Sequence, residues 1–367
     1  MKHIGSGHSL LRLPVAATLV KATPVWILLA AAIDPMAAQQ LFVNAATGVD
    51  TNAGTRAQPL RSLTEAARRI NGDATSKSSE IIVAPGLYVL SQTALFKNSK
   101  AYTATDRLVI RAEVLPDDPA WHPQQMPTVV TTVPLVADEG GEFGNGIQIE
   151  VNHATVQGLR FTGGLDFPYK GPTQIRRTYP LWRGGKNLDD LLVKQCVFMG
   201  DEQAMPLHVG VIANGHGLVL EHDVFYNVRN AVVFWSAEGG TSHRNAMRNC
   251  LVHGAGTSAI WTVETDGDDF DFRNNVIANS RIAWMRERGG TRRYKAVSVF
   301  TDNANMAAYG AGATGSITLT DSTFLSFQEM RLAGKVDLVM DRSERNYLHI
   351  RKGSAGYEVN AGLFTQD

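Results

Sequence analysis

Short alternating runs of apolar and polar residues recur along the chain after residue 140. In each run apolar residues take every second position, a polar corner follows, and a second short alternating run begins. The segments with this pattern are 154–161, 191–198, 218–225, 245–252, 270–277 and 317–324. Equivalent apolar residues are 27 positions apart from Val193 to Leu220 and from Leu220 to Met247, and 25 apart from Met247 to Phe272. A self-similar period of about 26 residues predicts a solenoid.

The residue types of these repeats favour strands over helices, because the runs are short, β-branched and punctuated by Asn and Gly. Three short strands per turn, stacked in parallel, predict an all-β chain that forms a single right-handed parallel β-helix. In this register Leu220, Met247 and Phe272 point into the core. Their neighbours Glu221, Arg248 and Arg273 point outward.

One column of corner residues is polar throughout and contains Gln195, His222, Asn249, Asn274 and Asp321. We expect their side chains to form a hydrogen-bonded ladder, which favours a structural role for His222 over a catalytic one. Cys196, Asp223 and Cys250 share the next column. The two cysteines are two coils apart, about 9–10 Å, which is beyond disulfide reach and predicts two free thiols.

The first 38 residues have the pattern of a signal peptide. Lys2, Arg12 and Lys21 precede or border an apolar run at 23–33, and small residues at 36–38 offer a cleavage site after Ala38. The apolar run is short for a membrane span, so a membrane anchor is the less favoured alternative. We expect a secreted or periplasmic protein with no membrane contact after cleavage.

Composition narrows the function without assigning it. Lys+Arg and Asp+Glu both number 35, and this formal neutrality argues against a protein that coats nucleic acid. The only two cysteines lack the CxxC spacing of a zinc site.

The sequence pattern predicts an N-terminal cap and first coil at residues 39–90. It predicts that residues 91–367 form the β-helix. A strand and a Gly/Asn-rich turn precede a helix at 63–70, with Ser62 as its N-cap and Glu65 three residues later. A solenoid needs its first coil covered, which an amphipathic helix achieves.

The series FVNAATGVDTNAGTRAQPLRSLTEAARRI, followed by IIVAPGLY, resembles the opening of secreted right-handed β-helix proteins of the pectate-lyase-like superfamily. The resemblance covers residues 41–88 and the repeats that follow. It implies a secreted protein that handles glycans. It does not choose a reaction, because the superfamily includes lyases, hydrolases, epimerases and phage tailspikes.

Two basic, aromatic-rich insertions, 165–186 and 286–295, predict arms beside a groove for a polyanion. Arg177, Arg286 and Arg288 are candidate contacts for carboxylate or sulfate groups, with solvated loops as the alternative. Between the arms, alternation places His208, Trp235 and Trp261 outward on one parallel sheet. The two tryptophans are candidate stacking surfaces for sugars, unless a loop covers them.

A polyanion groove favours β-elimination from a uronate-containing glycan. This reaction needs a base for the C5 proton, an acid for the leaving oxygen and a cation that neutralises the C6 carboxylate. The candidate bases and acids are His208, Tyr226 and His253, of which the last two occupy matching outward positions on adjacent coils. Arg248, Lys194 and Arg286 are candidate neutralising groups.

Two other kinds of function fit the same residues. A glycoside hydrolase would use paired carboxylates, for which Glu238, Glu264 and Asp266 are candidates. A non-catalytic glycan-binding β-helix would keep the tryptophans and the basic arms. Ca²⁺ is the cofactor that an acidic glycan site admits, with oxygen ligands from several coils. We expect a monomer whose partner is an acidic polysaccharide.

Overall fold

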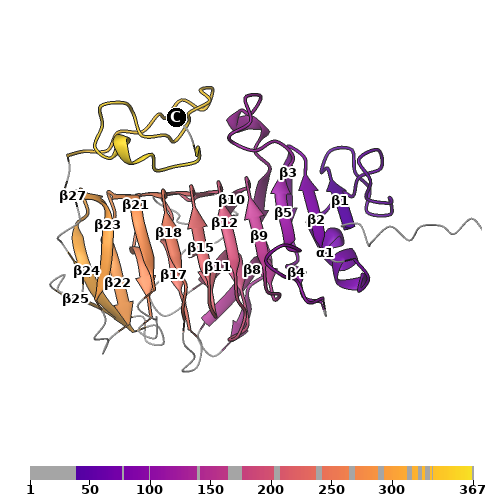
Figure 1. Ribbon diagram of the computed structural model, residues 1–367, viewed down its shortest axis with the longest axis horizontal. Helices are drawn as coiled ribbons and strands as arrows, with labels where there is room; N and C mark the ends of the chain where they lie inside the picture. The colour runs from indigo at the N-terminus through magenta and orange to yellow at the C-terminus, as the bar shows by residue number, and fades with distance from the viewer. Residues whose placement is uncertain are drawn as a thin grey trace, which may run out of the picture. The chain divides into compact units, whose positions relative to one another are not determined.

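The computed structural model describes residues 39–365 except 77, 99, 139–140, 164–175, 202–206, 237–241, 264–268, 288–292, 312–315, 321–324, 327–330 and 333. These residues belong to one compact unit, Met36–Asp367. The unit is a parallel β-helix (Figure 1), which confirms the predicted fold class. None of the helices in this part of the chain has the length and apolarity that a membrane crossing requires.

The first face of the β-helix is a parallel stack in which each strand pairs with its equivalent one coil away. It consists of β1 (Gln39–Val43), β2 (Ser79–Val83), β5 (Leu108–Ala112), β9 (Ala154–Gln157), β12 (Leu191–Lys194), β15 (Leu218–Glu221), β18 (Ala246–Arg248), the starts of β21 (Asp271–Ala278) and β23 (Tyr294–Thr301), and β26 (Leu325–Ser326).

The second face follows the first across a tight corner. It consists of β3 (Leu87–Leu90), β6 (Thr128–Thr131), β10 (Arg160–Gly163), β13 (Val197–Met199), β16 (Val224–Tyr226), β19 (Leu251–His253), the ends of β21 and β23, and β27 (Arg331–Leu332). Because β21 and β23 run through this corner, the two faces are hydrogen-bonded into one sheet.

The third face is a separate sheet. Its parallel strands are β4 (Ala94–Phe96), β8 (Gly141–Ile149), β11 (Arg176–Arg183), β14 (Val209–Ala213), β17 (Asn230–Phe234), β20 (Ser258–Thr262), β22 (Ile282–Glu287) and β24 (Asn305–Ala311). Two further strands, β7 (Val136–Asp138) and β25 (Ser316–Thr320), pair antiparallel with β8 and β24. Two expectations are corrected here. Residues 176–183 are a regular strand rather than part of an arm, and residues 316–320 do not repeat the first-face pattern.

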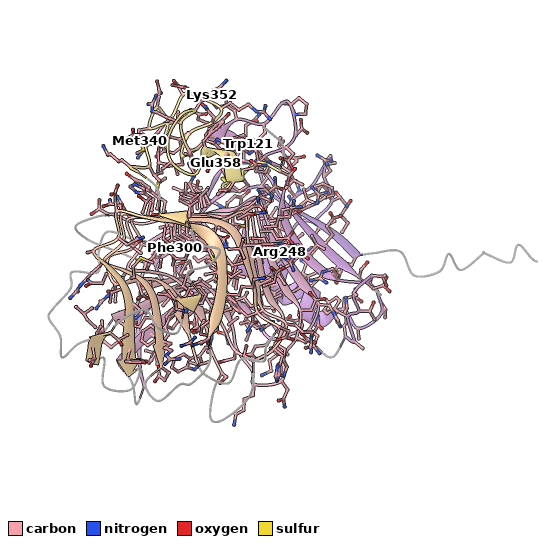
Figure 2. All side chains as sticks on the ribbon, turned by 60° about the vertical axis from the view of Figure 1, so that its left-hand side comes forward. Trp121, Arg248, Phe300, Met340, Lys352 and Glu358 are labelled. Carbon is pink, nitrogen blue, oxygen red and sulfur yellow. The ribbon has the colours of Figure 1, made fainter. Side chains whose placement is uncertain are left out.

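The interior is apolar and stacked in register. The rings of Phe161, Phe198 and Phe225 lie parallel on successive coils, with centroids 4.9 and 4.8 Å apart. Phe300 is fully buried near the other end of the stack (Figure 2). Continuous stacking of equivalent side chains is what a strict repeat register produces.

The predicted corner column between the first and second faces is confirmed by its backbone. Gln195, His222, Asn249 and Asn274 all adopt left-handed conformations, with φ between 52° and 55°. This region is unfavourable for most L-residues, and Asn and His are among the residues enriched in it. Asp321, assigned to the same column, lies outside the described residues.

The expected ladder does exist, but in the next column, whose side chains point inward. Asp223 Oδ1 accepts a hydrogen bond from the Cys196 N–H (2.8 Å), and Asn275 Oδ1 accepts one from the Cys250 N–H (2.9 Å). The corner side chains themselves turn outward and bind a different part of the chain. Both cysteines are buried and free, as predicted, and burial raises the pKa of each thiol.

Asp223 is a carboxyl group in a ladder position that suits an amide. It is fully buried, its Oδ2 has no hydrogen-bond partner in the described part of the chain, and burial raises its pKa well above the ordinary value. In the equivalent position Asn275 uses its Nδ2 to donate to the carbonyl of Met247 (2.8 Å). An amide at position 223 could donate in the same way to the carbonyl of Val193.

We therefore expect Asp223→Asn to raise the free energy of unfolding by about 1–3 kcal/mol near neutral pH. The folded-state pKa of Asp223 lies above the unfolded value of about 3.9, so the wild type loses stability as pH rises through that interval. The stability advantage of Asp223→Asn over the wild type should therefore become smaller toward pH 4. Urea unfolding across pH measures both effects, with Asn275→Asp as the reverse change in the same column. An Asp223→Asn variant less stable than wild type at neutral pH contradicts the assignment.

The N-terminal cap contains α1 (Leu63–Gly72), which covers the first coil as predicted. Ser62 is the N-cap and its Oγ accepts a hydrogen bond from the Glu65 N–H (3.1 Å). Leu63, Ala66 and Ile70 are fully buried in the main core. The helix therefore closes one end of the stack of coils.

Residues 335–365, the C-terminal segment, add no further coil and instead run back across the second face (Figure 1). They cover an outward aliphatic stripe in strand register, Val197, Val224, Leu251, Val276 and Val299. The corner column binds the same segment. Gln195 Nε2 donates to the carbonyl of Leu363 (3.0 Å), Asn249 Nδ2 donates to that of Val359 (3.0 Å), and His222 Nδ1 lies 2.9 Å from that of Gly362.

Candidate functional site

The outer surface of the third face carries a continuous row of large apolar side chains. We name its aromatic members the aromatic strip: Phe143, Tyr179, Trp182, Trp235 and Trp261. At Trp261 the row continues into a second cluster with Ile282, Met285 and Ala308. The row crosses the strands from β8 to β24, roughly 30 Å at the spacing of parallel strands. It lies on the sheet where sequence alternation predicted outward tryptophans.

Strand register explains why these side chains align. Trp182 on β11 pairs with Ile212 on β14, which pairs with Val233 on β17, which pairs with Trp261 on β20. Because the pairing is parallel and unshifted at these positions, their side chains leave the same side of the sheet.

Trp235 and Trp261 form a pair at the β20 end of the strip. Their ring centroids are 6.4 Å apart and their planes cross at 82°. Both are half-buried. The indole Nε1 of Trp261 is buried and has no hydrogen-bond partner in the residues described. The structure therefore brings together the two tryptophans that were expected to stack on sugars.

His208 lies immediately before β14 and beside Tyr179 of the neighbouring coil. The two ring centroids are 6.1 Å apart, with an edge-on angle of 63°. The backbone N–H of His208 donates to the carbonyl of Thr178 (3.1 Å), which fixes the histidine against β11. An imidazole and a phenol, both able to exchange protons, thus lie together on the aromatic strip.

Amide and carboxylate groups flank the strip on β8. Asn145 Nδ2 donates to Gln148 Oε1 (3.2 Å), and Gln148 Nε2 donates to Glu150 Oε1 (2.5 Å). Lys97 pairs with Glu150 at 2.8 Å. Since Gln148 is the register partner of Trp182, this polar row adjoins the apolar one. Such a border supplies donors and acceptors that sugar hydroxyls can use.

Arg286 does not lie on an exposed arm, so that expectation is corrected. It belongs to β22, is 6% exposed and faces the interior side of the sheet. Its Nη2 donates to the hydroxyl of Tyr309 (2.8 Å), and its guanidinium lies 4.9 Å from that ring's centroid. The alternation along β22, rather than charge, decides which way this side chain points.

Five other candidates lie, wholly or by their side chains, outside the described part of the structure. Arg177 lies on β11, but its side chain is outside the described part of the structure. Arg288, Glu238, Glu264 and Asp266 also lie outside the described residues. Their roles remain predictions.

Lys194 and Arg248 lie on the first face, away from the strip. They are separated by Glu221, which pairs in register with both. Arg248 binds Glu221 (2.9 Å) and Asp271 (2.7 Å) through different nitrogens. The guanidinium is thus held in a charge ladder on the surface of the β-helix.

Tyr226 and His253 stack on adjacent coils of the second face, with centroids 5.7 Å apart and planes at 15°. This confirms their matching positions. Tyr226 packs against the cluster that includes the C-terminal segment. Burial lowers the pKa of His253, and the positive charge of Lys335 lowers it further. The pair therefore sits beside that segment and on a different face from His208.

A second polar cluster lies where third-face strands turn back into the first face. His216 and His243 stack with centroids 5.6 Å apart, and Arg244 pairs with Asp189 at 2.5 Å. Arg183 is fully buried beneath this turn, and burial lowers its pKa to about 10. These contacts tie the turns of successive coils to one another.

The predicted catalytic residues thus fall on three faces, and one sugar unit cannot contact them all. The structure adds Tyr179 and Trp182 to the third-face candidates. The sequence pattern assigns both to the basic, aromatic-rich arm at 165–186, because residues 176–183 look like part of an irregular insertion. Trp182 is 30 positions before its partner Ile212, close to the repeat period, and that spacing was the available signal.

No group of three or more His, Cys, Asp or Glu side chains that could hold a metal occurs among the residues described. Ca²⁺ binding therefore remains an untested alternative.

No family model and no curated protein matches this chain. Among solved structures it is similar to a lacto-N-biosidase from Eubacterium ramulus, at 11% identity and a TM-score of 0.49, over 85% of this chain and 68% of that one. It is also similar to a rhamnogalacturonan lyase, at 10% identity and a TM-score of 0.41, over 89% of this chain and 100% of that one. XylC in complex with xylose aligns at 10% identity and a TM-score of 0.40, over 73% and 67% of the two chains. These values carry no argument about activity, which rests on the chain's own residues.

Proposed function

We propose that this protein cleaves an acidic polysaccharide by β-elimination, with the polymer bound along the aromatic strip of the third face. The observation that carries the proposal is the position of His208 beside the buried Tyr179, on a strip whose other aromatic rings are half-buried. The signal-peptide pattern of residues 1–38 leads us to propose that the reaction occurs outside the cytoplasm.

The strip has the properties that a bound glycan needs. A pyranose ring presents an apolar face and a polar rim, so it fits a surface where aromatic rings border amides and carboxylates. Trp235 and Trp261 supply rings, and Gln148 and Glu150 lie in the polar border. Isolated exposed aromatics are ordinary on protein surfaces, but a contiguous row over several coils is typical of a binding surface.

The reaction assigns one role to each group. His208 removes the C5 proton of a uronate, and the electron pair of that C–H bond forms the C4=C5 double bond. The C4–O bond breaks, and its oxygen takes a proton from the Tyr179 hydroxyl. Arg177 and Arg288 are the proposed cations that neutralise the C6 carboxylate and so make the C5 proton more acidic.

A panel of acidic polysaccharides tests the reaction type. Elimination creates a conjugated double bond, so ultraviolet absorbance should rise together with new reducing ends. New reducing ends without absorbance would move the assignment to hydrolysis by carboxylates such as Glu238, Glu264 or Asp266. Binding without either signal would identify a glycan-binding protein. Parallel reactions with Ca²⁺ or a chelator decide the cofactor question.

Trp261→Ala should weaken binding of the cleaved polymer about tenfold, because it removes the ring that joins the strip to the second apolar cluster. Titration calorimetry with a catalytically inactive background measures the dissociation constant directly. Leu319→Ala is the matched control, since this apolar side chain is exposed on β25 of the same sheet. If Trp261→Ala and Leu319→Ala bind the polymer equally well, the aromatic strip is not the binding surface.

A further inference from the structure

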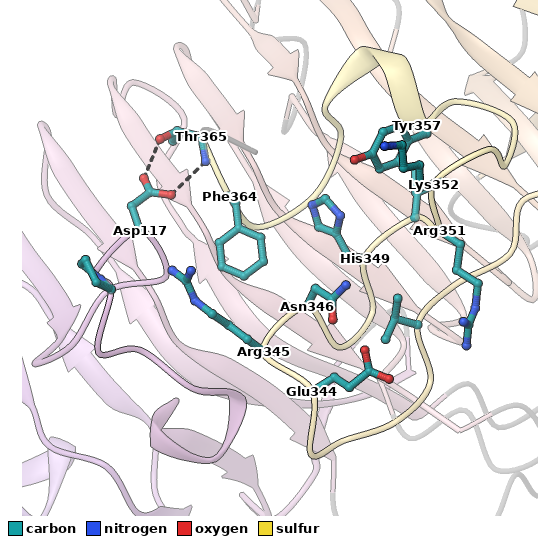
Figure 3. Close-up of a pocket in the computed structure, with 13 residues that line it drawn as sticks. Asp117, Glu344, Arg345, Asn346, His349, Arg351, Lys352, Tyr357, Phe364 and Thr365 are labelled. Carbon is teal, nitrogen blue, oxygen red and sulfur yellow. Dashed lines mark hydrogen bonds between the residues drawn. The ribbon is translucent and has the colours of Figure 1, made fainter.

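A pocket of about 1040 Å³ lies between the C-terminal segment and the loop that carries Asp117 and Pro119 (Figure 3). Its size is in the range of small-molecule sites. None of its lining residues belongs to the third face. It is therefore separate from the aromatic strip.

The floor of the pocket is buried and combines an imidazole with an aromatic ring. His349 and Phe364 are 8% and 9% exposed, and their ring centroids are 5.4 Å apart. Figure 3 shows both side chains at the centre of the view. An imidazole beside an aromatic ring at the buried floor of a pocket offers a ligand one polar and one apolar contact, which together orient it.

Several charged groups around the pocket serve to hold its shape. Both oxygens of Asp117 bind Thr365, one to its N–H (2.9 Å) and one to its Oγ1 (2.6 Å). Arg345 Nη2 donates to the carbonyls of Pro116 and Asp118, both at 3.2 Å, and its guanidinium lies over the ring of Phe364. These charges are committed to the protein itself.

Two cations on the opposite wall remain available. Arg351 donates from Nε to the carbonyl of Leu338 (3.0 Å), which leaves its terminal nitrogens for other partners. Lys352 is exposed, and its side chain extends beside Tyr357 (Figure 3). Neither has a carboxylate partner within the described residues. Tyr357 lies beside them and offers a ring and a hydroxyl (Figure 3).

We propose that this pocket is a second binding site, for a sugar that carries a single carboxylate. Lys352 binds the carboxylate, and the ring of the sugar rests between Tyr357 and the His349–Phe364 floor. Glu344 on the rim offsets one of the two cations. The balance of one positive charge fits a uronate better than a dianion such as phosphate.

The site goes beyond the proposed cleavage activity, because it would hold an acidic polymer without acting on it. Two separate contacts on one polymer raise the effective concentration of the second after the first has formed. The pocket would therefore retain the protein on its polymer between cleavage events.

The test uses the full chain with monomeric glucuronate and galacturonate, which offer no bond to cleave. Glucose and galactose are the neutral controls. We expect a uronate to bind measurably in calorimetry or NMR titration, and the corresponding neutral sugar at least tenfold more weakly. Lys352→Glu should reduce uronate binding at least tenfold while leaving the backbone contact of Arg351 intact. Lys335→Ala, which removes an exposed lysine of the same segment outside the pocket, should leave it unchanged.

The comparison with the strip separates the two sites. Trp261→Ala should leave monomeric uronate binding unchanged, and Lys352→Glu should leave turnover of short oligomers unchanged. Equal binding of a uronate and its neutral sugar, or unaltered uronate binding in Lys352→Glu, overturns the pocket assignment. If Trp261→Ala loses uronate binding, the uronate binds at the aromatic strip and not in the pocket. Absence of elimination activity would not alter this test, because no step of it depends on cleavage.

Discussion

Replacing His208 by Ala should lower turnover of the acidic polymer by about 10²–10⁴-fold, because it removes the proposed base from the C5 proton. The imidazole ring lies against Tyr179 with its plane inclined by 63°, and the backbone of His208 is fixed to β11 by its hydrogen bond to Thr178. Binding should change little, since Trp235 and Trp261 remain. Steady-state assays and calorimetry on the same preparation separate the two effects.

His122→Ala provides the matched control, because it makes the same change in a loop away from the third face. His253→Ala tests whether the reaction takes place on the second face instead of the third. If His253→Ala abolishes turnover and His208→Ala does not, the reaction takes place beside the C-terminal segment. If neither substitution lowers turnover, the assignment of a histidine base is wrong.

Truncation after residue 334, which removes the C-terminal segment, should lower the free energy of unfolding by on the order of 5 kcal/mol or more. The truncation exposes the aliphatic stripe of the second face, and each such side chain contributes about 1.5–3 kcal/mol when buried. The ordering entropy of the segment offsets part of this loss. The truncation also removes the hydrogen-bond partners of Gln195, His222 and Asn249. Chemical unfolding and binding of a hydrophobic dye measure the stability and the exposed surface.

Point substitutions check the same prediction without truncation. Leu363→Ala removes a side chain that is 3% exposed, and it should cost about 2–5 kcal/mol. Met340→Ala changes a side chain of the same segment that is 45% exposed, and it should cost little. A truncated protein with wild-type stability and no dye binding would show that the stripe is not held by this segment.

The coil architecture was predictable because it is periodic. A repeat of 25–27 residues fixes which positions meet on successive coils, and the inward rows, the corner column and the free cysteines follow from that count alone. The ladder was misplaced by one residue. The left-handed corner residue turns its side chain outward, so it is the residue after the corner, such as Asp223 or Asn275, that reaches the next coil.

The candidate site was less predictable because it depends on non-periodic residues. Trp235 and Trp261 could be placed together by alternation, whereas Tyr179 was hidden in a segment whose arginines and proline resembled a loop. Arg286 was misjudged because charge suggested exposure where strand alternation dictated burial. The C-terminal segment contacts the second face through side chains that are far apart in sequence from that face. A local sequence pattern does not predict such packing.

Hydrogen exchange with and without bound polymer tests the central claim, that the third face is the glycan surface. The inactive His208→Ala variant keeps the polymer intact during the measurement. We predict slower exchange in β14, β17 and β20 when polymer is present, whatever happens at the C-terminal pocket. Unchanged exchange in those three strands, with protection on the first or second face alone, would contradict the account.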